Sequence, residues 1–104
     1  MGYDSTVSVY NEDGRYMGNV INDVSINSVR ELIIYSRDKQ LSDKKLDKLF
    51  MFGDINCDIK IMKDFLDDMD MSDIEENVSK NWLVNRCKKI VKNDNIKYFS
   101  ITSV

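Results

Sequence analysis

The stretch Ser5–Ile21, STVSVYNEDGRYMGNVI, is the part of the sequence that decides the fold. Its first six residues are β-branched, small or aromatic, as is typical of a strand. The residues NEDG supply a turn, in which Gly14 can adopt positive φ at no steric cost. The segment RYMGNVI then returns as a second strand, so the sequence predicts an N-terminal β-hairpin over residues 5–21.

The last nine residues, IKYFSITSV (96–104), predict one more strand, because aromatic and β-branched residues alternate with small polar ones. We expect this strand to join the hairpin in one small antiparallel or mixed sheet. About four helices between them would cover one face of the sheet. The chain of 104 residues is 42% hydrophobic, which predicts a single compact α+β domain over residues 1–104.

Two helices are predicted directly after the hairpin. Ser28 and Glu31 have the spacing of a capping box, which predicts a helix from about residue 28 to residue 40. Ser42 can cap a second, shorter helix. Gly53 is predicted to end that helix in a left-handed conformation.

A third helix is predicted to begin after Asp58, which can act as its N-cap. Apolar residues recur at helical spacing after that position and predict one buried face: Ile59, Met62, Phe65, Leu66 and Met69.

A fourth helix is predicted from a second capping box, Ser72 with Glu75, to about Lys92. Its apolar residues do not form one stripe. Ile74, Val78 and Trp82 follow one line, and a second group lies on nearly the opposite side: Leu83, Val84, Cys87, Ile90 and Val91. Either the helix breaks near Ser79–Lys80 or its two halves pack against different surfaces, which leaves self-association as an option.

The segment GDINCDIK (53–60) resembles the beginning of an EF-hand calcium loop, since Asp54, Asn56 and Asp58 occupy the first three ligand positions. The sixth position, which requires glycine, is Ile59, and the twelfth, which requires an acid, is Phe65. We therefore interpret the segment as a connection between helices and predict no metal site.

The composition argues against an enzyme. The chain has no histidine and two cysteines, so the commonest general base, the Ser-His and Cys-His pairs and the usual zinc sets are all missing. No phosphate-binding or nucleophile-elbow motif occurs. We expect no cofactor. The N-terminus lacks a secretory signal and no apolar run reaches the length of a membrane span, so we expect a cytoplasmic protein with no membrane contact.

Charge is distributed unevenly. Residues 54–76 contain nine acids and two lysines, whereas residues 79–104 contain six bases and one acid. The acidic segment is our first candidate surface for binding a protein partner, with these contact residues: Asp64, Asp67, Asp68, Asp70, Asp73 and Glu76.

The basic segment provides an alternative, because basic side chains near a flat aromatic ring can hold phosphates and stack a base. This nucleic-acid-binding candidate is the Trp82–Lys92 helix face, with these residues: Trp82, Arg86, Lys88, Lys89 and Lys92.

These observations favour a small, non-enzymatic protein that binds and inhibits or regulates another protein. Antitoxin-like, immunity-like and phage counter-defence (anti-CRISPR-like) inhibitors, encoded by phages or other mobile elements, have this character. The alternative is a nucleic-acid-binding accessory protein that uses the Trp82–Lys92 helix face.

Overall fold

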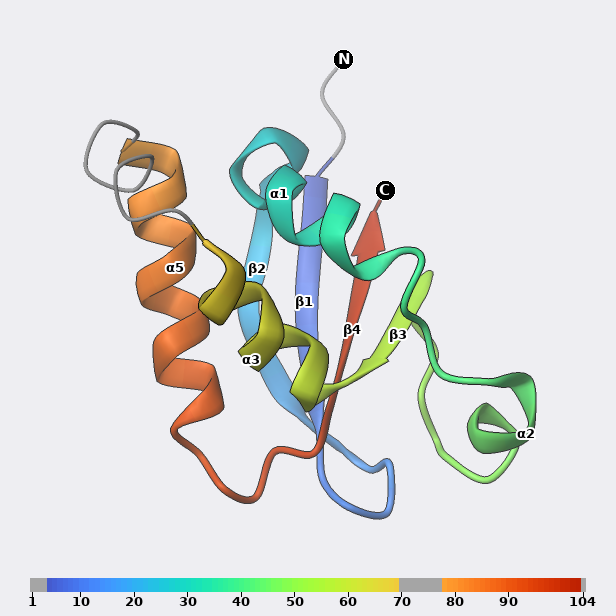
Figure 1. Ribbon diagram of the computed structural model, residues 1–104. Coiled ribbons are helices and arrows are strands. Elements are labelled where there is room, and N and C mark those ends of the chain that lie inside the picture. Colours follow the sequence, from blue (N-terminus) through green and yellow to red (C-terminus); the bar gives the residue numbers. More distant parts are fainter. Residues whose placement is uncertain (1–3, 70–77, 104) are drawn as a thin grey trace.

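The structure, a computed structural model, describes residues 4–69 and 78–103. Those residues form four strands, β1 (Asp4–Tyr10), β2 (Tyr16–Ser25), β3 (Ile55–Asp58) and β4 (Tyr98–Ser103), and four helices, α1 (Ile26–Ser36), α2 (Asp43–Leu46), α3 (Ile59–Asp68) and α5 (Val78–Val91). The strands make one antiparallel sheet in the order β2-β1-β4-β3, with α1, α3 and α5 against one face (Figure 1). The predicted α+β fold is confirmed.

The predicted hairpin is confirmed, and β2 runs four residues beyond its predicted end. Gly14 has φ of 77° and donates its backbone N–H to the carbonyl of Asn11 at 2.9 Å. The side chain of Asn11 accepts hydrogen bonds from the backbone N–H groups of Asp13 and Arg15, each at 3.0 Å. Three register shifts between β1 and β2 make β2 an irregular edge strand.

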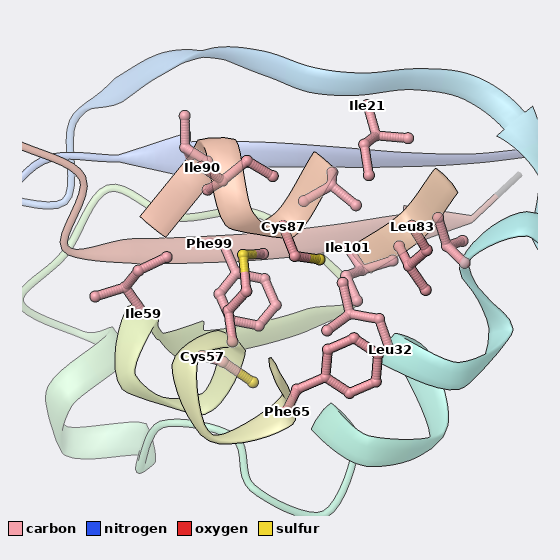
Figure 2. Packing of buried hydrophobic residues seen from close by; sticks show 14 of the residues in the cluster. Ile21, Leu32, Cys57, Ile59, Phe65, Leu83, Cys87, Ile90, Phe99 and Ile101 are labelled. Carbon is pink, nitrogen blue, oxygen red and sulfur yellow. The ribbon is translucent and has the colours of Figure 1, made fainter. Parts of the chain in front are cut away.

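The helix-covered face of the sheet carries the main core. Val7 and Val9 of β1 alternate with polar neighbours, and they pair across the sheet with Ile101 and Phe99 of β4. Leu32, Phe65 and the α5 side chains Leu83, Cys87 and Ile90 close over this surface (Figure 2). This packing of α1, α3 and α5 on one face rests on burial of apolar area, whereas α2 does not join them as predicted and lies on the opposite face.

Strand β3 corrects the prediction that residues 54–58 are only a connection. Ile55 and Cys57 face the helices and pair with Ile101 and Phe99, while Asn56 and Asp58 alternate toward the opposite side. Asp and Asn are typical of turns, which is why the sequence of this short strand indicates a connection. Asp58 also caps α3 as predicted, because its carboxylate accepts the backbone N–H of Lys60 at 2.9 Å.

Helix α1 begins and ends earlier than predicted. Its N-cap is Ser25, not Ser28, because β2 continues directly into the helix. The helix stops at Ser36 because the chain must leave it to reach the edge of the sheet. The backbone N–H of Leu41 donates to the carbonyl of Asn56 at 2.9 Å, which covers part of the outer edge of β3.

Residues 41–53, which we call the strap, pack against the opposite face of the sheet. Tyr10 and Tyr98 alternate with the core residues of β1 and β4, and they form a second small cluster with these strap residues: Leu41, Leu46, Leu49 and Met51. Ser42 caps α2 as predicted. The role predicted for Gly53 is wrong, because its φ is not positive. A Cβ there would overlap the Cβ of Ser100, so glycine is needed for close approach.

Helices α3 and α5 bury the faces that the sequence predicts. Ile59, Met62 and Phe65 of α3 are buried, and Leu66 and Met69 are half-buried. Helix α5 is continuous through Ser79–Lys80, so the first of the two alternatives, a break at that point, does not occur. The predicted capping box at Ser72 and Glu75, and Ile74 with it, lie outside the described residues.

Candidate functional site

Three of the predicted acidic contact residues lie together on α3. Asp64, Asp67 and Asp68 are on the side of the helix away from Ile59, Met62 and Phe65, so helical periodicity alone directs them outward. Asp67 and Asp68 are exposed and Asp64 is half-buried. No salt bridge within the described ranges neutralises any of the three carboxylates.

Tyr35 of α1 connects this acidic group to the core. Its ring packs edge-on against Phe65, with ring centroids 5.5 Å apart, and its hydroxyl donates a hydrogen bond to the Oδ2 atom of Asp68 at 2.5 Å. The Nζ atom of Lys39 lies over the Tyr35 ring, 4.0 Å from its centroid. Residues from two helices therefore fix the position of one carboxylate.

The carboxylates near Tyr35 raise the pKa of its hydroxyl group. The hydrogen bond to Asp68 is the main cause that raises this pKa to about 12, followed by desolvation and the charges of Asp68, Asp64 and Asp67. All three carboxylates act on one phenol, so they form a single negative surface. We call these four residues the acidic face: Tyr35, Asp64, Asp67 and Asp68.

The other three predicted acidic contacts, Asp70, Asp73 and Glu76, lie outside the described residues. The acidic face is therefore the part of the predicted surface that the structure places.

The structure divides the predicted basic surface into two rows. Trp82, Arg86 and Lys89 recur four and three residues apart and share one flank of α5, on which the guanidinium carbon of Arg86 lies 5.7 Å from the Trp82 ring. Lys88 and Lys92, four residues apart, form a separate row. All four basic residues are exposed, whereas Trp82 is half-buried against the main core.

A hollow that the sequence did not predict lies beside the first row. It has a volume of about 340 Å³ and is bounded by six residues from β2, α5 and the loop that follows α5: Val20, Arg86, Lys89, Ile90, Asn93 and Ile96. Sequence reasoning had no means of finding this hollow, because it requires Val20 to lie beside residues about 70 positions later in the chain.

The three polar residues of the calcium-like segment each have a structural role. Asp54 accepts the backbone N–H of Ser103 at 3.0 Å, and Asn56 bonds the backbone N–H and carbonyl of Gly53 at 3.0 and 2.8 Å. Asp58 caps α3. Residues 4–69 and 78–103 contain no group of three or more His, Cys, Asp or Glu side chains arranged to hold a metal ion.

The two cysteines are buried thiols on the helix-covered side of the sheet. Burial is the main cause that raises the pKa of Cys57 to about 12, with the charge of Asp58 adding to it and that of Lys39 opposing it. Burial alone raises the pKa of Cys87 to about 12. Neither thiol has the exposure or the lowered pKa of a reactive nucleophile.

Comparison with protein-family models, with curated proteins and with solved structures found no match for this chain. Among the described residues, no helix combines the length and the apolar character needed to span a membrane.

Proposed function

We propose that this protein binds another protein and inhibits or regulates it, and that the acidic face is part of the contact surface. One observation carries this proposal: the Asp68 carboxylate accepts a hydrogen bond from Tyr35, Asp64 and Asp67 lie on the same side of α3, and none of the three is salt-bridged within the described parts of the chain. A fixed cluster of like charges stabilises a complex only when a partner supplies positive charge.

The arrangement of Tyr35 supports a contact role over a purely solvated surface. Tyrosine combines a rigid apolar ring with a polar end, and it is enriched at the centres of protein interfaces. Here the ring is held by Phe65 and the hydroxyl by Asp68, so little side-chain entropy remains to be lost on binding. The proposed partner is a protein with a basic surface, as in antitoxin-like and immunity-like inhibition.

The test is affinity capture from a lysate of the organism that encodes the chain, with and without nuclease. We compare the native protein with a variant that carries Asp64→Asn, Asp67→Asn and Asp68→Asn. A matched control changes three exposed acids elsewhere: Asp13→Asn, Asp43→Asn and Asp47→Asn. We expect one stoichiometric protein that survives nuclease, is retained by the control and is lost from the acidic-face variant. Equal retention by both variants would overturn the proposed contact surface.

A second candidate function is nucleic-acid binding through the Trp82–Lys92 helix face. The proximity of Arg86 to the Trp82 ring favours it, because an aromatic ring beside a guanidinium suits a base and its phosphate. A variant with Lys88→Glu, Lys89→Glu and Lys92→Glu should then lose salt-dependent binding to single-stranded DNA and RNA. Unchanged binding in this variant would eliminate the second candidate.

A further inference from the structure

The hollow between α5 and β2 has an apolar floor and a polar rim. Ile90 and Ile96 are 5% and 6% exposed and form the floor with the half-buried Val20. Arg86, Lys89 and Asn93 form the rim. The volume of about 340 Å³ is at the small end of the range found for ligand sites, which suits a small ligand or a single side chain.

The two charged side chains of the rim, those of Arg86 and Lys89, are hydrogen-bond donors. Arginine and lysine side chains have no acceptor. The amide oxygen of Asn93 accepts the backbone N–H of Asn95 at 3.0 Å, and its NH₂ group is a further donor. The rim contains no acidic side chain, and neither of its two cations forms a salt bridge in the part of the chain that the structure describes. The hollow is therefore complementary to a head group that only accepts hydrogen bonds.

Lys89 has an additional structural explanation, because a cation in the last turn of α5 complements the helix dipole. Arg86 lies one turn earlier, where that effect has faded. The helix dipole therefore does not explain the position of Arg86, whose guanidinium carbon lies 5.7 Å from the centroid of the Trp82 ring.

We infer that this hollow binds an organic anion with a carboxylate or phosphate head and a short apolar body, a ligand unrelated to the proposed protein contact on α3. The head accepts hydrogen bonds from Arg86, Lys89 and Asn93. The apolar body covers Val20, Ile90 and Ile96. The register shifts in β2 oppose regular addition of a further strand at this edge, so the ligand occupies the hollow and does not extend the sheet.

The test follows the methyl resonances of Val20, Ile90 and Ile96 by NMR during titration with three probes. N-acetyl-leucine and phenyl phosphate supply the two heads on apolar bodies, and N-acetyl-leucinamide is the neutral control. We expect saturable shifts with at least one anion and none with the amide. The inference would be overturned if neither anion gave saturable shifts of these resonances, or if the amide gave equal shifts. This test needs no variant of the protein.

Two double variants locate the head group. Arg86→Gln with Lys89→Gln removes the rim cations, while Lys88→Gln with Lys92→Gln removes the same charge from the other row of α5. We expect the first pair to weaken binding of the anion at least about tenfold and the second to leave it nearly unchanged. Equal weakening by both pairs would indicate general charge attraction and contradict a built site.

A final probe distinguishes the source of a carboxylate. A tetrapeptide, N-acetyl-Gly-Gly-Gly-Leu with a free C-terminus, places the same leucine at the end of a chain. Tighter binding than N-acetyl-leucine would assign the hollow to the C-terminus of a partner protein, and equal or weaker binding to a free small acid. Failure of the acidic-face capture experiment would leave all of these outcomes unaffected, because the two surfaces share no residue.

Discussion

The two faces of the sheet are stabilised in different ways. Beneath α1, α3 and α5, aliphatic and aromatic side chains fill the space, and Phe99 and Val7 have no exposed area. On the opposite face, Tyr10 and Tyr98 are covered by the strap, and a buried hydrogen bond of 2.9 Å joins the hydroxyls of Tyr10 and Ser100. The first face depends on the amount of apolar area buried, and the second on a few close contacts.

This difference explains why the second face requires glycine at two positions. A Cβ at Gly14 would lie 2.7 Å from the Cβ of Leu49, and a Cβ at Gly53 would meet Ser100. The hairpin turn and the end of the strap thus approach their neighbours more closely than any other residue would allow. Substitutions should therefore act through cavities on the first face and through steric overlap and lost hydrogen bonds on the second.

The largest effect is expected on the helix-covered face. Phe99→Ala should reduce the free energy of unfolding by about 3–5 kcal/mol, because it leaves a cavity in the main core beneath the interior strand β4. Phe52→Ala is the matched control, since Phe52 lies on the strap and is 88% exposed. Its change should stay below about 0.5 kcal/mol. Urea denaturation measures both, and similar losses would contradict the assignment of the core.

A smaller loss is expected on the opposite face. Gly53→Ala should cost about 1–3 kcal/mol, because the added methyl group overlaps Ser100 and the strap has to move. A double-mutant cycle with Ser100→Gly tests the cause, since this change removes the atoms that the methyl group meets. We expect Gly53→Ala to cost less in the Ser100→Gly background. Additive losses would show that the strap tolerates the methyl group in another way.

The elements that depend on local pattern were predictable from the sequence. Alternation around Gly14 indicated the hairpin, and the spacing of Ile59, Met62 and Phe65 indicated α3. Strand β3 was missed because its four residues, INCD, acquire their meaning only from pairing with Phe99 and Ile101 more than 40 residues later. The end of α1 was misplaced for the same reason, since Leu41 leaves the helical path to bond Asn56.

The candidate surfaces show the same limit. Sequence spacing alone directs Asp64, Asp67 and Asp68 away from the core, but the hydrogen bond from Tyr35 depends on how α1 packs against α3. The predicted row of Trp82, Arg86 and Lys89 is a helical property, whereas the hollow beside it needs Val20 from β2. Helical periodicity predicts which residues share a side, and tertiary packing decides what that side meets.

Tyr10 and Tyr16 form a matched pair that tests the hydrogen bond on the second face, for which we expect an effect of about 1 kcal/mol on the free energy of unfolding. Tyr10→Phe removes the buried hydrogen bond to Ser100 and should reduce the free energy of unfolding by about that amount. Tyr16 also bonds a side chain, donating to Asn19 at 2.8 Å, but it is 60% exposed. Tyr16→Phe should therefore change stability by less than about 0.5 kcal/mol, because water replaces the lost partner. Equal losses of stability in the two variants would show that the buried hydrogen bond between Tyr10 and Ser100 contributes no more than the exposed one.

Thiol reactivity should differ strongly between the two faces of the sheet, although the expected change in stability is the smallest of those considered. Burial raises the pKa of Cys57 and Cys87 above that of a free thiol, so both stay protonated in the folded state. This contribution to stability is complete below the pKa of the thiols in the unfolded chain, near 8.5, and is lost as the pH rises toward about 12.

At pH 8, a disulfide reagent should thus label Cys57 and Cys87 only as fast as the covered face opens, and urea should accelerate labelling in step with unfolding. A cysteine introduced by Ser8→Cys, at a half-buried position on the opposite face, should react at a rate close to that of a free thiol. Rapid labelling of Cys57 in the folded protein would mean that the helices leave the covered face more readily than its packing implies.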